Sequence, residues 1–360
     1  MNIALRVIIF TAGLALVIYT SRSAIHTFVL PRSVSDFLAR ALFLTTRFLF
    51  DLQAKKANSY EERDRIMAIY APLSLLLLLP FWLILVLIGY MGMFWAVGVE
   101  SWRAAFLLSG SSLLTLGFAP VNDLPQTILA FTEATIGLIL IALLIAYLPS
   151  MYAAFSRREA AVALLEVRAG SPPSAVEMIL RFQRIHGLHR LTEQWVAWEN
   201  WFVELDESHT SLAALVFFRS PQPERSWITA AGTVLDAAAL VDSTVDLPRE
   251  PEAQLCLRAG YIALRRIADF FDVPYNPNPN PDDPISISRD EFDAAYNRLA
   301  QQGVPLKPDR DEAWRNFNGW RVNYDAPLLA LAGLTMAPYA PWSSDRSLRY
   351  RRGLFRRRRG

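Results

Sequence analysis

Residues 111–120 read SSLLTLGFAP and lie between two apolar runs of membrane length. The first run, Tyr70–Val99, carries no charged residue, and the second, Thr127–Phe155, carries only Glu133. An apolar run of about 18 residues or more is typical of a transmembrane helix. We therefore predict that this short stretch connects two membrane-spanning helices, and its conformation decides what kind of membrane protein this is.

The residues before the stretch predict a short helix. Ser101 is a suitable N-cap for a helix near Trp102–Leu114, which is too short to span a membrane and too apolar for an exposed loop. A helix that enters the membrane partway must return through irregular backbone, which survives there only when it is buried in protein or lines a water-filled path. Gly117 permits unusual backbone angles and Pro120 cannot continue a helix, so TLGFAP is predicted to form that return.

This order of segments resembles the pore of the potassium-channel family. The outer helix would be Tyr70–Val99, the pore helix would lie near Trp102–Leu114, and the inner helix would be Thr127–Phe155. The family filter reads Thr-Val-Gly-Tyr-Gly, with Phe accepted for Tyr and other aliphatic residues for Val. The resemblance implies that four copies replace the hydration shell of a K⁺ ion with backbone oxygens. The filter residues would be Thr115, Leu116, Gly117, Phe118 and Ala119.

The match departs from the family at its outer end. Ala119 stands where the family has its second filter glycine, and Pro120 stands where the family has aspartate. Alanine adopts the angles open to glycine only at a cost. Reduced selectivity, low conductance and no conduction all remain open. We expect a homotetrameric cation channel that conducts K⁺. The alternative is a non-conducting, membrane-anchored scaffold or sensor built on a channel fold.

Three residues of the predicted inner helix are further candidates. Glu133 would either attract cations at the outer pore or brace the filter through Ser109, Ser111 or Ser112. Gly137 matches the position of the family's inner-helix hinge. Pro149 either bends the helix at a gate or marks a helix that is nearing its end.

The N-terminal part, residues 1–69, is predicted to contain a retained membrane helix over Ile3–Thr20. Basic residues are frequent between this run and Tyr70, whereas Arg103 is the single basic residue between the two long runs. The segment before Tyr70 is therefore predicted to face the cytoplasm. Asp36, Arg40, Arg47 and Asp51 share one stripe of an apolar helix. We favour an amphipathic helix in the cytoplasmic interface. The alternative is a fourth span with its stripe packed inward, which would move the N-terminus from outside to inside.

The remaining chain predicts a mostly helical cytoplasmic domain over residues 156–345. Trp195, Trp198 and Trp201 read as a core stripe, Ser288 with Glu291 as a capping box, and Cys256 as a core residue. His186 and His189 lack the further ligands that zinc needs. No enzyme motif is recognisable, so we expect neither catalysis nor a bound cofactor or metal.

The last segment, residues 346–360, is a strongly basic tail with interleaved apolar residues. A tail tethered to a membrane meets anionic lipid headgroups before nucleic acid, so we expect lipid and not nucleic acid as its partner. The lipid-binding candidates are Arg351, Arg352, Arg356, Arg357, Arg358 and Arg359. The sequence thus predicts an all-α, multi-pass protein of the cell membrane, with its pore domain at residues 70–155.

Overall fold

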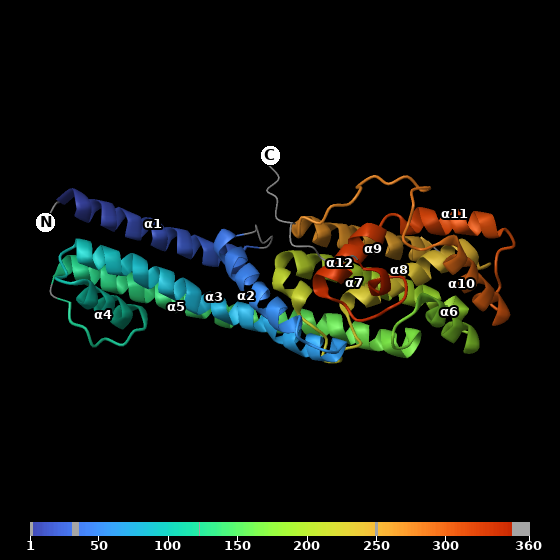
Figure 1. Cartoon of the computed structure of the whole chain (residues 1–360), viewed down its shortest axis with the longest axis horizontal. Helices are drawn as coiled ribbons and strands as arrows, with labels where there is room; N and C mark the ends of the chain where they lie inside the picture. Colours follow the sequence, from blue (N-terminus) through green and yellow to red (C-terminus); the bar gives the residue numbers. More distant parts are fainter. Residues whose placement is uncertain (1–2, 31–35, 122, 249–250, 348–360) are drawn as a thin grey trace. The chain divides into compact units, whose positions relative to one another are not determined.

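The computed structural model describes residues 3–30, 36–121, 123–248 and 251–347. Within these ranges the chain forms twelve α-helices and three short 3₁₀ segments, without a regular strand (Figure 1). The all-α class is confirmed. The chain divides into two compact units, Met1–Ala153 and Ala154–Gly360, and the boundary falls inside one helix.

Among the described residues, three helices are long and apolar enough to cross a membrane: α1 (Ile3–Phe28), α3 (Tyr60–Ala96) and α5 (Leu124–Ala169). Helices α1 and α5 contain the predicted runs and extend beyond them. Helix α3 begins before Tyr70 but ends at Ala96, three residues before the predicted end at Val99. Helix α3 begins early because Ser59 caps it, accepting a hydrogen bond from the Glu62 amide at 3.1 Å. Helix α5 continues past Phe155 until Gly170, whose φ of +85° suits a helix end.

Helix α1 packs antiparallel to α3. A Cβ atom on Gly13 would lie 2.4 Å from the Gly89 carbonyl oxygen, so the two backbones touch at this crossing. Ile9 lies beside Gly92, whereas Ser23 receives a 3.1 Å hydrogen bond from the indole of Trp82. Residue numbers therefore rise along α1 as they fall along α3. The close contact explains why glycine occupies both positions.

Helix α2 (Phe37–Ala54) also packs on α3. Asp36 caps it, accepting hydrogen bonds from the amides of Leu38 and Ala39 at 3.0 and 3.1 Å. Arg47 pairs with Asp51 at 2.9 Å and lies over the ring of Tyr70 in α3. Arg47, one of the four residues of the charged stripe, thus contacts α3. Several large apolar side chains of α2 are exposed instead: Phe37, Leu44, Phe48, Leu49 and Leu52.

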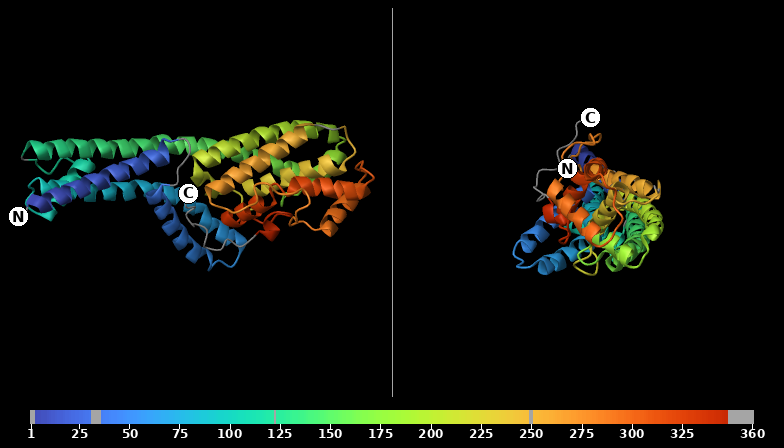
Figure 2. Two further views of the ribbon diagram at one scale, coloured as in Figure 1. Left: turned by 90° about the horizontal axis from the view of Figure 1, so that it is seen from above. Right: turned by 90° about the vertical axis from the view of Figure 1, so that its right-hand side faces the viewer.

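The second unit contains seven further helices (Figure 1; Figure 2). They are α6 (Ala175–Arg184), α7 (Leu191–Ser211), α8 (Trp227–Thr244), α9 (Pro251–Phe270), α10 (Arg289–Gln301), α11 (Arg310–Arg321) and α12 (Asp325–Thr335). Every residue of α8 except Asp242 is buried, so α8 is the core of this unit. A buried network holds it: Asp236 accepts hydrogen bonds from Arg321 at 2.5 Å and from Tyr324 at 2.8 Å.

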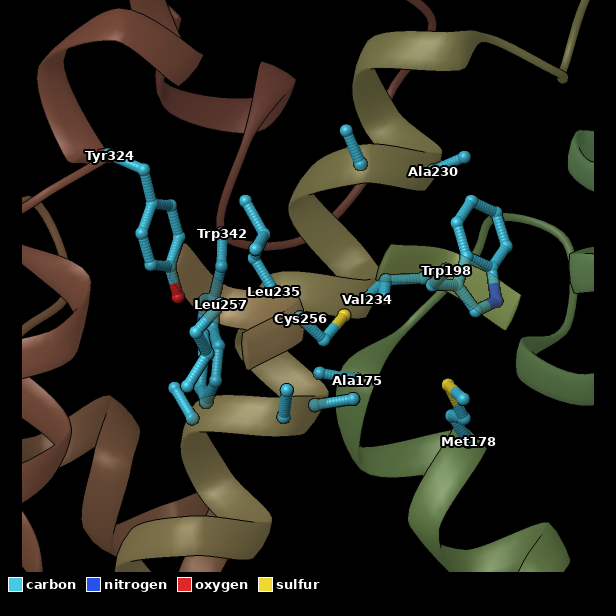
Figure 3. Close-up of a cluster of buried hydrophobic side chains, with 14 of the residues drawn as sticks. Ala175, Met178, Trp198, Ala230, Val234, Leu235, Cys256, Leu257, Tyr324 and Trp342 are labelled. Atoms are coloured by element: carbon cyan, nitrogen blue, oxygen red, sulfur yellow. The ribbon is translucent and has the colours of Figure 1, made fainter. Parts of the chain in front are cut away.

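Several sequence-based predictions for this unit are confirmed. Cys256 is fully buried, and Figure 3 shows it within a cluster of buried side chains that also contains Val234 and Trp198. The three tryptophans of α7 line the same core. Ser288 and Glu291 form both hydrogen bonds of a capping box at the start of α10.

Candidate functional site

Helix α4 (Trp102–Leu113) is the predicted short helix, and it begins and ends within one residue of the prediction. The Ser101 side chain caps it, accepting a hydrogen bond from the Ala104 amide at 3.1 Å. Trp102 stacks on Trp95, near the end of α3, with ring centroids 5.0 Å apart. The start of α4 therefore lies beside the end of α3.

The other end of α4 lies between α3 and α5. Ser109 contacts the carbonyl of Leu87 at 3.2 Å, about two turns of α3 before Trp95. A Cβ atom on Gly137 would lie 2.5 Å from the Leu113 carbonyl oxygen, about three and a half turns into α5. Helix α4 therefore runs back along its neighbours α3 and α5.

Helix α4 ends in a Schellman turn. The amide of Thr115 donates to the Ser112 carbonyl at 3.0 Å, and that of Leu116 donates to the Ser111 carbonyl at 2.8 Å. Thr115 occupies the left-handed position of this turn, with φ of 54°. Glycine is usual there, and a β-branched residue in this region is strained. Threonine at such a position points to a use for its hydroxyl or for its constrained backbone.

Ser111 organises the loop that follows. Its hydroxyl accepts hydrogen bonds from the amides of Phe118 and Ala119 at 3.0 and 3.1 Å. Its carbonyl accepts from Gly117 as well as from Leu116. Ser111 therefore accepts hydrogen bonds from four successive amides, those of residues 116–119. From the sequence, Ser111 is expected only as a possible partner for Glu133, because nothing in its local pattern indicates this role.

No donor among the described residues pairs with any of the five carbonyl oxygens of residues 115–119. A row of backbone oxygens with no protein partner is what a cation-coordinating loop requires. In this single chain the side chains of Leu116 and Phe118 are both exposed.

The backbone angles of Gly117 and Ala119 indicate which of these two positions requires glycine. Gly117 has φ of +70°, which disfavours any L side chain, although a Cβ atom there would meet nothing within 4 Å. Ala119 is not among the residues with positive φ. Alanine is therefore compatible with its backbone angle in this loop.

Glu133 lies behind the loop and is fully buried. Its Oε1 lies 2.5 Å from the Ser109 hydroxyl, one of the three serines expected as partners, while Oε2 has no partner among the described residues. Nearby, Tyr90 of α3 donates to Thr132 of α5 at 3.0 Å, which links these two helices directly.

Helix α5 is continuous through both Gly137 and Pro149. Gly137 permits the close approach of Leu113, which gives this glycine a packing role in addition to the predicted hinge. Pro149 is followed by residues that stay helical to Ala169, so it does not mark a helix that is nearing its end.

Two further predictions concern the basic tail and metal binding. The six arginines of the basic tail lie outside the described residues. Across the described part of the chain, no group of three His, Cys, Asp or Glu side chains is placed to hold a metal ion. Comparison of the chain with protein-family models, with curated proteins and with solved structures finds no match in any of the three.

Proposed function

We propose that this chain is the subunit of a tetrameric membrane channel that conducts K⁺ through a ring of four loops formed by residues 115–119. The observation that carries the proposal is the Ser111-centred loop. Four amides of this loop turn toward one serine, and five successive carbonyl oxygens have no donor among the described residues. One copy supplies one strand of a filter, so a closed ring of copies is needed to surround an ion.

The orientation of α4 supports the same proposal. A helix carries partial negative charge at its C-terminal end. The C-terminal end of α4 lies between α3 and α5, well inside the span region, as the contacts of Ser109 and Leu113 indicate. Four such ends around an axis would favour a cation at mid-membrane depth.

The packing of α1 supports three spans. With three spans α1 runs antiparallel to α3, and with four spans the two helices would run parallel. The contacts of Gly13 and Ser23 are antiparallel. Together with the basic residues before Tyr70, this favours an N-terminus outside and a second unit in the cytoplasm. We propose that this second unit assembles or regulates the pore.

The proposal assigns Glu133 to bracing. Its buried contact with Ser109 ties α5 to the helix on which the loop stands. A carboxylate that attracts ions must face their path, whereas Glu133 is fully enclosed by its own chain.

Flux from proteoliposomes tests the function. We expect the full-length protein to release K⁺ without valinomycin, and we expect Gly117→Ala to abolish that release. Valinomycin added afterwards shows that each preparation still holds K⁺. A protein that assembles correctly and releases no K⁺ would favour the non-conducting scaffold.

A further inference from the structure

The first turn of α5 in the second unit is held by a buried arginine. Arg158 is only 4% exposed. Its guanidinium donates to the carbonyls of Leu215 and Phe218 at 2.8 and 2.7 Å, at the end of the 3₁₀ segment Ala213–Phe217. Its Nε donates to Glu159 at 2.9 Å. Arg158 thereby fastens α5 to the segment that follows α7.

The same guanidinium fixes the protonation of a histidine. Arg158 Nη1 lies 3.2 Å from His209 Nε2. A guanidinium nitrogen can only donate, so Nε2 must accept, and the ring proton must be on Nδ1. Nδ1 lies 3.1 Å from the Ser208 hydroxyl. His209 is therefore neutral when this contact is formed.

The surroundings give a charged imidazole no support. His209 is fully buried, with its ring 4.9 Å from that of Trp227 in α8. The charged groups at the contact both come from α5: Arg158 itself and Glu159, which is paired with Arg158. Burial, and then the neighbouring Arg158, lower the pKa of His209 well below its ordinary value of 6.5.

We propose that Arg158 and His209 form a proton-released latch, which holds the cytoplasmic part of α5 at neutral pH and lets go when His209 binds a proton. A protonated His209 has no acceptor for Arg158 and places two cations in contact. Because α5 is one helix from Leu124 to Ala169, the latch holds the same helix that follows the candidate filter loop. Its effect on conduction rests on the proposed function, but the latch itself does not.

The expected size of the response follows from linkage. The closed latch excludes the proton, whereas in the released state His209 regains an ordinary pKa near 6.5. The latch is thus unaffected above pH 6.5 and weakens as the pH falls below it. Between pH 7.5 and pH 5.0 the released population should rise about 30-fold.

Amide hydrogen exchange on the full-length protein in detergent measures this population. After correction for intrinsic exchange, protection of residues 155–165 and 205–218 should fall about 30-fold from pH 7.5 to 5.0. His209→Gln keeps an acceptor for Arg158 and should remove the pH response. Two controls should keep it: Glu159→Gln, and the double variant of the exposed histidines, His186→Gln/His189→Gln.

An unchanged wild-type profile, or a pH response that survives in His209→Gln, would overturn the latch. Flux measured on the same preparations separates this result from the function. If exchange responds as expected while no variant conducts K⁺, the latch stands and the channel proposal fails. If flux is present and exchange does not respond, the channel stands and the latch fails.

Discussion

Ser109 Oγ lies 2.5 Å from Glu133 Oε1 where α4 meets α5, and both side chains are fully buried. The same hydroxyl lies 3.2 Å from the Leu87 carbonyl in α3. One serine of α4 thus contacts both α3 and α5, and α4 is the helix that precedes the candidate filter loop. Because the loop follows the C-terminal end of α4 directly, contacts that hold α4 in place also position the carbonyl groups of residues 115–119.

This contact predicts different outcomes for two substitutions of Glu133. Glu133→Ala leaves Ser109 without this partner and opens a void, which should cost about 1–3 kcal/mol and lower the melting temperature. Glu133→Gln keeps an oxygen for Ser109 and fills the same space, so it should stay close to the wild type in stability and flux. Thermal unfolding in detergent measures the difference, and equal melting of the two variants would argue against the brace.

Ser111 and Ser112 form a matched pair for the loop. Ser111→Ala removes the acceptor of the Phe118 and Ala119 amides, so we expect lost K⁺ selectivity and a destabilisation of about 1–2 kcal/mol. Among the described residues, the Ser112 hydroxyl bonds only to the Leu108 carbonyl of its own helix, so Ser112→Ala should have little effect. The K⁺/Na⁺ permeability ratio of both variants checks this. The role of Ser111 would be refuted by a wild-type ratio in Ser111→Ala.

Substitutions at Thr115 and Gly117 should have different effects on stability. Gly117→Ala places a side chain at φ of +70° and should cost about 1–2 kcal/mol, through backbone strain alone because the space is open. Thr115→Gly removes a β-branched residue from φ of 54°, so it should not lower the melting temperature, although it should lower flux. A marked loss of stability in Thr115→Gly would show that the threonine is not strained.

Gly137 and Gly110 separate packing from hinge bending. Gly137→Ala would place Cβ 2.5 Å from the Leu113 carbonyl oxygen, whereas at Gly110 the nearest atom would be 4.0 Å away. We expect Gly137→Ala to lower the melting temperature and Gly110→Ala to be neutral or stabilising, since alanine favours helix. A hinge without a packing role predicts normal stability with reduced flux for Gly137→Ala.

The sequence predicted those parts of the site that depend on local signals. Ser101, Gly117 and Pro120 placed α4 and its return, because caps and helix breakers act on their neighbours in the chain. It did not predict the hydrogen bonds from four amides to Ser111, because these bonds form only once the Schellman turn is in place. The pairing of Arg158 with His209 spans 51 residues, and no periodicity signals such a contact.

The orientation of α2 was also beyond the sequence. A stripe containing Arg47 and Asp51 fits either a water-facing side or a protein-facing side of one helix. In the structure the guanidinium of Arg47 lies over the ring of Tyr70 in α3. The same ring packs against Phe43 and Phe50 of α2. Only the partner helix decides which side an amphipathic pattern presents.

The position of bound cations in the assembled protein distinguishes a conducting ring from a scaffold. An experimental structure of the full-length protein, determined with Tl⁺ in place of K⁺, would locate bound cations by their anomalous scattering. We predict a four-fold ring with Tl⁺ on its axis, coordinated by the carbonyls of Thr115, Leu116 and Gly117. A monomer or dimer, or a tetramer whose axis holds no cation beside these carbonyls, would contradict the account.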